Sequence, residues 1–216
     1  DLNREQLPSD EYDVIWANGS LHHMADVDGV VSRLYSALRD GGYLVANEYV
    51  GPQYQQIESR QQELVNAAKH LLPRDLRGKV LYPRPNGQSI LARAIRSARR
   101  RLRERRHNEV YGVLWERQPV EDFLAKDPSE CVGSHLVIPA LKKHFEHVDV
   151  RYFNGSLLFY ALDATFYENY DPRNPRHVNA LKMLFYVEDA LAEAGEIAQD
   201  NAHIICRKGR EVLSRV

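Results

Sequence analysis

The feature that most constrains the fold is a strand–helix–strand pattern near the start of the chain. Residues 11–52 read EYDVIWANGSLHHMADVDGVVSRLYSALRDGGYLVANEYVGP. The apolar run at 14–17 follows acidic turn residues, as in a strand covered on both faces. A second apolar run at 43–46 comes after an amphipathic helix. Such a βαβ unit requires parallel strands joined by a right-handed crossover, so the sequence predicts an α/β fold.

The helix of this unit carries its own start and stop signals. Asp26 or Asp28 can act as its N-cap. Its apolar residues share one face: Val30, Val31, Leu34 and Leu38. The run Asp40-Gly41-Gly42 is expected to end the helix, because glycine adopts the left-handed C′ conformation at little cost.

Composition excludes several classes of protein. Charged residues make up 27% of the 216 residues and the formal net charge is −1, which argues against nucleic acid as the main partner. No apolar run approaches the roughly 20 residues that a membrane-spanning helix needs. The cysteines, Cys131 and Cys206, have neither disulfide-scaffold nor metal-ligand spacing, which fits a reducing compartment. We therefore expect a cytoplasmic protein with no membrane span.

Residues 51–145 differ in character from the preceding segment and predict a mainly helical insertion or lid. A proline ends a helix expected at 58–72, and the proline-rich segment 82–87 reads as a loop. A strongly basic helix is expected at 89–107. Asp127-Pro128-Ser129-Glu130 predicts a further helix N-terminus, where acidic residues complement the helix dipole.

Residues 146–216 predict a return to the core of the domain. The stretch 147–153 alternates like a strand, and 203–207 predicts a last short strand. After the first of these, Asn154-Gly155 fits a hairpin turn. The residues that follow fit a helix capped by Ser156 equally well, and we favour the helix.

A longer helix is expected after Asn174-Pro175, since proline favours the first turn of a helix. Its apolar residues lie on or near one side: Val178, Leu181, Phe185 and Leu191. Gly195 is expected near its end.

The segment at 11–48 resembles the middle of the class I S-adenosylmethionine-dependent methyltransferases, of the type 11-like kind. In that family the fourth strand ends in a pattern like FDxVxxNxxLHH, here YDVIWANGSLHH at 12–23. A helix and an LxxGGxLV turn into the fifth strand follow, here LRDGGYLV at 38–45. The two late strands resemble the antiparallel pair that closes that fold.

The resemblance implies a partial Rossmann-like sheet with a large helical insertion. It assigns 1–50 to the C-terminal half of the cofactor-binding core, 51–145 to the insertion and 146–216 to the closing strands and helices. The family's first three strands and Gly-rich loop have no counterpart in this sequence. The segment DLNREQLPSDEYD reads as an internal part of a longer protein. We therefore expect the C-terminal part of a bacterial-type enzyme with a truncated N-terminus.

The same resemblance implies S-adenosyl-L-methionine as cofactor and S-adenosyl-L-homocysteine as product. Asp1 and Leu2 stand where the family contacts adenine, through an Asp side chain and the next backbone N–H. The turn after the first strand is expected against the methionyl part of the cofactor, at Asn18, Gly19, Ser20 and Leu21. An ordinary strand-to-helix turn is the alternative for Asn18, Gly19 and Ser20, and simple packing is the alternative for Leu21.

Three titratable residues are candidates for handling the methyl acceptor. His22 and His23 can remove a proton from a hydroxyl or amine, since histidine titrates near neutrality, although a structural role is the alternative for either. Glu48 follows the second strand and can grip the acceptor, act as a base or remain a rim residue. Tyr49 and Tyr54 are the substrate-binding candidates. No metal site is expected, because neighbouring histidines rarely converge on one ion and no third ligand is evident.

A run of arginines marks the expected basic helix: Arg93, Arg96, Arg99, Arg100, Arg101, Arg103, Arg105 and Arg106. Such a helix can bind a phosphate-bearing acceptor, an anionic membrane surface or RNA. A solvated helix face with local pairing to Glu104 and Glu109 is the alternative.

These expectations favour methyl transfer to an oxygen or nitrogen atom of a small molecule or glycan. The rival interpretation is a non-catalytic interaction module, in which a truncated or degenerate methyltransferase-like domain binds a partner. Unpaired strand edges act as templates for pairing, which would also fit a homodimer.

Overall fold

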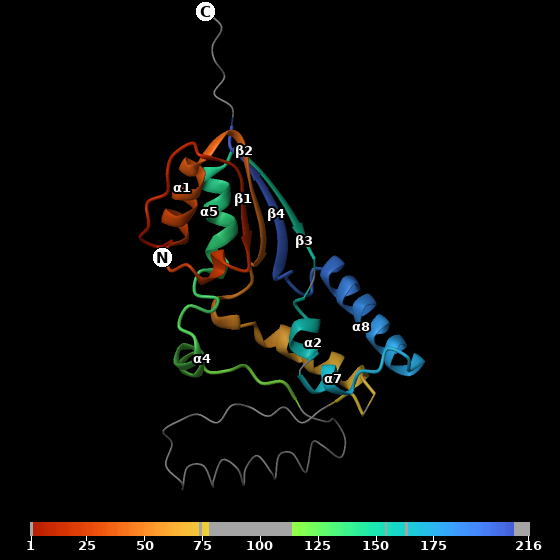
Figure 1. The fold of residues 1–216 in the computed structure, drawn as a ribbon. Coiled ribbons are helices and arrows are strands. Elements are labelled where there is room, and N and C mark those ends of the chain that lie inside the picture. Colours follow the sequence, from red (N-terminus) through yellow and green to blue (C-terminus); the bar gives the residue numbers. More distant parts are fainter. Residues whose placement is uncertain (1, 74, 78–113, 154, 163, 210–216) are drawn as a thin grey trace, which may run out of the picture. The chain divides into compact units, whose positions relative to one another are not determined.

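The structure is a computed structural model that describes residues 2–73, 75–77, 114–153, 155–162 and 164–209 (Figure 1). The chain divides into two compact units. The first unit comprises Asp1–Ile57, Gln118–Gly155 and Ala198–Val216, and the second comprises Glu58–Arg117 and Ser156–Ile197.

The first unit is built on a four-stranded sheet with the order β1-β2-β4-β3. Its strands are β1 (Tyr12–Asn18), β2 (Leu38–Tyr49), β3 (His147–Tyr152) and β4 (Asn201–Arg207). β1 pairs parallel to β2, whereas β4 runs antiparallel to both β2 and β3. Three strands therefore run in one direction. The prediction of an α/β fold with a parallel pair and an antiparallel closing pair is confirmed.

Two helices cover one face of this sheet, α1 (Val27–Ala37) and α5 (Val137–His144), which lie side by side (Figure 1). Alternate residues of the central strands pack beneath them, including Leu44 and Ile204, which are fully buried. The opposite face carries exposed apolar side chains: Val14, Trp16, Tyr43 and Ile205.

The Gly-Gly segment does not end α1 as the sequence led us to expect. α1 stops at Ala37, and β2 already begins at Leu38, whose side chain is completely buried. Gly41 has φ 78°, and the pairing register between β1 and β2 shifts at this point. The expectation was wrong because the glycines form an irregularity within the strand, which keeps Leu38 in the core while the pairing resumes further on.

A second correction concerns residues 127–131. The helix α4 (Val120–Lys126) ends just before them, and they form a turn instead of a helix N-terminus. The Asp127 carboxylate accepts hydrogen bonds from the amide and hydroxyl of Ser129, at 2.9 and 2.7 Å. This local turn competes successfully with helix formation. A short 3₁₀ helix, η3 (Ser134–Leu136), then leads into α5.

The second unit is helical in its described part. It contains α2 (Ser59–Leu71), α6 (Leu158–Ala161), α7 (Ala164–Asn169) and α8 (Pro175–Glu193). The favoured helix after Ser156 is present as α6, but Ser156 is not its N-cap. The buried carboxylate of Glu188 instead accepts hydrogen bonds from the amides of Leu157 and Leu158.

The predicted apolar face of α8 is only partly correct. Asn174 caps the helix as expected, accepting a hydrogen bond from the Arg176 amide at 3.0 Å. The buried residues of α8 are His177, Ala180, Leu184 and Glu188. Phe185 is 48% exposed, so hydropathy placed it on the wrong side.

Two sequence-based expectations lie outside the described residues, namely the loop at 82–87 and the arginine-rich helix at 89–107. Among the residues that the structure describes, no helix has the length and apolar character required to cross a lipid bilayer.

Candidate active site

The turn that follows β1 lies at the carboxyl ends of the two parallel strands. Gly19 donates its amide to the Asn47 carbonyl at 2.8 Å, and the Asn18 side chain accepts from that of Asn47, also at 2.8 Å. Gly19 has φ +58°, a conformation that glycine adopts at little cost. A Cβ built on it would find one heavy atom within 4 Å, the Cε1 of His22 at 3.9 Å. The backbone at Gly19 is therefore accessible to a ligand.

Glu48 lies directly behind this turn and is 2% exposed. Its Oε1 accepts hydrogen bonds from the amides of Ser20 and Leu21, at 2.9 and 3.0 Å. Its Oε2 lies 2.7 Å from Nδ1 of His22. Burial raises the pKa of Glu48, but the hydrogen bonds from His22 and the two amides outweigh it, so the net shift is downward. The side chain thus caps the 3₁₀ helix η1 (Leu21–His23) as an ionised carboxylate.

His22 is fixed by Glu48 and is 7% exposed. Because Nδ1 faces a carboxylate, the neutral ring carries its proton there and its lone pair on Nε2. Nε2 makes no hydrogen bond within the described part of the chain. The ring also lies 4.3 Å from that of His23 and 6.3 Å from that of Tyr49, measured between centroids.

His23 contacts the turn at 127–131. Its Nδ1 lies 3.2 Å from the Ser129 hydroxyl, and its Nε2 lies 3.5 Å from a carboxylate oxygen of Glu130. The Ser129 hydroxyl in turn donates to Asp127. Hydrogen bonds from Ser129, through its hydroxyl and its amide, lower the pKa of Asp127 below its ordinary value.

Gly133 holds this turn close to η1. Its amide donates to the His22 carbonyl at 2.9 Å, and a Cβ at this position would collide with the Met24 carbonyl oxygen. Only glycine permits this approach of the two backbones. Asp127 and Glu130 were missed as site residues because more than a hundred positions separate them from the histidines, and Gly133 was the one local signal.

Both predicted substrate-binding tyrosines lie in the first unit and are partly buried. The Tyr49 hydroxyl donates to the Pro52 carbonyl at 3.3 Å. The Tyr54 amide donates to the Cys131 carbonyl at 3.3 Å, and its ring lies 6.2 Å from that of Phe123. Tyr54 is thus attached to the same turn as the acidic residues.

Of the two predicted adenine contacts, Asp1 and Leu2, the structure describes Leu2. Asp1 lies outside the described residues. Leu2 is partly exposed, and its carbonyl accepts a hydrogen bond from Arg33 at 2.9 Å. Leu21 is buried in the core, so its side chain supports the turn from behind.

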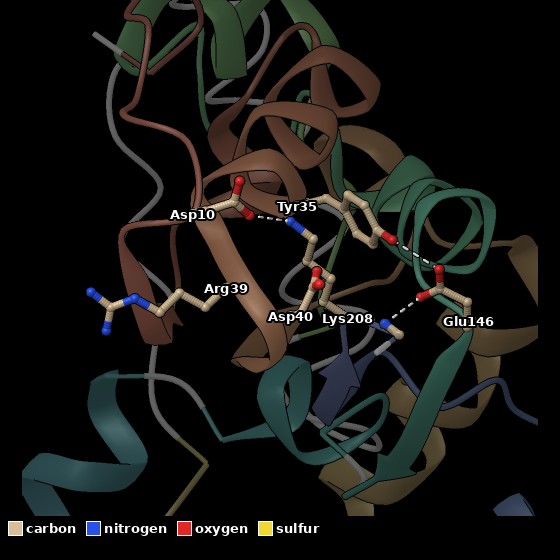
Figure 2. A pocket seen from close by; sticks show the side chains of 7 residues that line it. Asp10, Tyr35, Arg39, Asp40, Glu146 and Lys208 are labelled. Carbon is tan, nitrogen blue, oxygen red and sulfur yellow. Dashed lines mark hydrogen bonds and ion pairs between the residues drawn. The ribbon is translucent and has the colours of Figure 1, made fainter. Parts of the chain in front are cut away.

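An open polar pocket of about 610 Å³ lies at the opposite edge of the sheet, and sequence reasoning did not anticipate it. Figure 2 shows Tyr35 donating to Glu146 at 2.8 Å and Lys208 paired with Asp10 at 2.9 Å. The hydrogen bond to Glu146, followed by burial, raises the pKa of Tyr35 to about 12. Within the pocket Tyr35 is thus paired with Glu146, and Lys208 with Asp10.

Comparison with known proteins gives a match at the start of the chain. Residues 1–44 match a sequence family described as "Methyltransferase domain". This segment is similar to a methyltransferase domain. It contains β1, the turn at Gly19, both histidines and the start of β2. No curated protein matches the chain.

The similarity of the chain to solved structures is distant. The [4+2]-cyclase SpnF is 12% identical with a TM-score of 0.37, over 97% of this chain and 55% of that chain. Haemonchus contortus phosphoethanolamine N-methyltransferase 2, in complex with S-adenosyl-L-methionine, is 15% identical with a TM-score of 0.34, over 98% and 36%. An S-adenosylmethionine-dependent methyltransferase from Mesorhizobium loti is 14% identical with a TM-score of 0.35, over 96% and 67%.

The chain spans 55% and 36% of the length of the first two of these structures. Scores this low do not establish a fold by themselves. The fold described above rests on the strand order β1-β2-β4-β3 and on the parallel pairing of β1 with β2.

Proposed function

We propose that the protein containing this chain transfers a methyl group from S-adenosyl-L-methionine to an oxygen or nitrogen atom of a small molecule or glycan. The observation that carries this proposal is the turn at 18–23. It lies at the carboxyl ends of parallel strands, where open α/β sheets bind their ligands, and within the segment that matches a methyltransferase family.

The residues of the turn fit the methionyl part of S-adenosyl-L-methionine. The accessible backbone at Gly19 permits close approach of a ligand, and Asn18 presents polar atoms beside it. We assign these two residues to the methionyl part of the cofactor, and Asp1 and Leu2 to the adenine. When bound, S-adenosyl-L-methionine supplies an electrophilic methyl group on a positively charged sulfur.

His22 is our candidate for proton acceptor. Methylation of the acceptor oxygen or nitrogen would require removal of a proton from that atom. The proton leaving the acceptor passes to Nε2 of His22, the nitrogen with a free lone pair. Exclusion of water and alignment of the reacting atoms contribute the rest of the rate enhancement.

Glu48 has a different role from the one that its sequence position indicates. Its oxygens are occupied by two amides and by His22, and the side chain is buried. We therefore assign it as a positioning residue that fixes the tautomer and orientation of His22. A base acting directly on the acceptor would need a free oxygen at the surface.

The test combines a panel of sugar and small-molecule acceptors with measurement of S-adenosyl-L-homocysteine release by the full gene product. With an accepted substrate, His22→Ala is expected to lower kcat by roughly 10²–10⁴-fold while cofactor binding persists. The exposed His135 provides the matched control, and His135→Ala is expected to retain activity. Full turnover by His22→Ala would remove His22 from the mechanism. A gene product that binds no cofactor would favour the interaction-module interpretation.

A further inference from the structure

A group of metal-ligating side chains lies beside His22. One ligand atom each from His23, Asp127 and Glu130 lies within 4.8 Å of the other two. We propose that these three residues bind a divalent first-row metal ion. An imidazole nitrogen with two carboxylate oxygens is a donor set suited to manganese or zinc.

Within the described residues, His23 is the one cationic partner of the carboxylates of this group. Across the described ranges, no lysine or arginine forms an ion pair with Asp127 or Glu130. Glu130 is contacted by His23 and by the Cys131 thiol, and Asp127 accepts its side-chain hydrogen bond from Ser129. A divalent cation would compensate both negative charges at once.

An independent observation points to a ligand at the same place. His22 is a nine-tenths-buried imidazole whose Nε2 makes no hydrogen bond among the residues that the structure describes. One of its ring nitrogens lies within 4.8 Å of a ligand atom of Glu130, in a second group completed by Cys131. Glu130 is thus shared by two groups, one of which includes a nitrogen of the buried His22 ring.

The surroundings supply the support that metal ligands usually have. His23 approaches Glu130 with Nε2 while its Nδ1 contacts Ser129, which in turn contacts Asp127. Such contacts orient ligating side chains. The amide of Gly133 ties the acidic turn to η1 through the His22 carbonyl, so the two halves of the site are held together by backbone.

This inference goes beyond the proposed methyl transfer and differs from the sequence-based expectation of no metal. That expectation considered only the spacing of the two histidines. An ion bound by His23 would leave His22 free to meet an acceptor that coordinates the metal through a hydroxyl oxygen. The site would therefore favour acceptors with oxygen donors, such as sugar or other polyol hydroxyls.

The test is a titration of chelator-treated full gene product with Mn²⁺, followed by the electron paramagnetic resonance signal of the free ion. We expect one bound ion per chain. Glu130→Gln and Asp127→Asn are each expected to weaken binding at least tenfold. Glu121 is exposed, lies on α4 and serves as the matched control, so Glu121→Gln is expected to bind as the unmodified protein does. Absence of binding, or equal binding by all variants, would overturn the proposal.

A second measurement needs no variant that might unfold. Substoichiometric Mn²⁺ is expected to broaden the imidazole resonances of His23 far more than those of His147, which lies at the start of β3. Equal broadening of the two rings would contradict the site. Both experiments omit cofactor and acceptor. A negative result in them would therefore leave the proposed methyl transfer standing, and absence of methyl transfer would leave the metal site standing.

Discussion

At the scale of single residues, Glu48 connects the backbone amides of the turn to the imidazole of His22, the proposed base. A buried carboxylate is costly unless its oxygens are hydrogen-bonded, and here Ser20, Leu21 and His22 meet that requirement. The same contacts cap η1 and leave a lone pair on the outer nitrogen of the imidazole. One side chain therefore stabilises the turn and prepares the proposed base.

Replacing Glu48 with glutamine tests this arrangement. The amide keeps the size of the side chain, but its NH₂ group cannot accept a hydrogen bond from His22. We expect the free energy of unfolding to fall by about 1–3 kcal/mol, because buried polar groups lose their hydrogen-bond partners. Urea denaturation measures the change, with Glu121→Gln as the exposed control. Equal decreases in the free energy of unfolding for Glu48→Gln and Glu121→Gln would contradict the buried role of Glu48.

The stability of the protein in acid reports on the same carboxylate. Its folded-state pKa lies below the ordinary value of 4.5, so it contributes stability that is present above that pH. This contribution is lost as the pH falls through the folded-state pKa. The difference in unfolding free energy between the unmodified protein and Glu48→Gln is therefore expected to shrink below about pH 4.5. A difference that stays constant down to acid unfolding would refute this.

Sequence reasoning found His22, His23 and Glu48 because the carboxyl ends of parallel strands meet at one edge of a sheet. It did not find that Glu48 points inward. That depends on the register in which Asn18 pairs with Asn47, since a shift of one residue reverses the side of every side chain. The contact between His23 and Glu130 depends on packing between residues far apart in the sequence, which a local sequence pattern does not encode.

At the scale of elements, local chemistry decided where α1 begins but not where it ends. The sequence left Asp26 and Asp28 open as caps of α1. In the structure Asp26 accepts a hydrogen bond from the Gly29 amide at 2.9 Å, whereas Asp28 pairs with Lys143 at 2.7 Å. The C-terminus was misjudged because burial of Leu38 overrode the turn preference of the glycines.

The cap of α1 gives a prediction at this scale. Asp26→Ala is expected to destabilise the protein by about 0.5–2 kcal/mol, because the Gly29 amide loses its partner. Asp26→Ser, which retains a capping oxygen, is expected to recover most of this loss. Thermal unfolding of the three proteins measures both effects. Equal melting temperatures for the alanine and serine variants would show that the cap contributes nothing.

At the scale of the whole molecule, the parallel pairing of β1 with β2 was the most predictable feature, because two strands joined through a crossover helix run in the same direction. The buried face of α8 was less predictable. Hydropathy favours Phe185, yet His177 and Glu188 are buried instead. A polar side chain can be buried once its hydrogen bonds are satisfied, as those from Leu157 and Leu158 to Glu188 show.

The central claim is that the turn after β1 contacts the bound cofactor, S-adenosyl-L-methionine. Titration of the isotope-labelled full gene product with S-adenosyl-L-homocysteine, followed through its amide resonances, tests it most directly. The account predicts saturable shifts at Gly19 and Ser20, with little change at Asp149 on β3. Binding without shifts in this turn, or no binding at all, would contradict it.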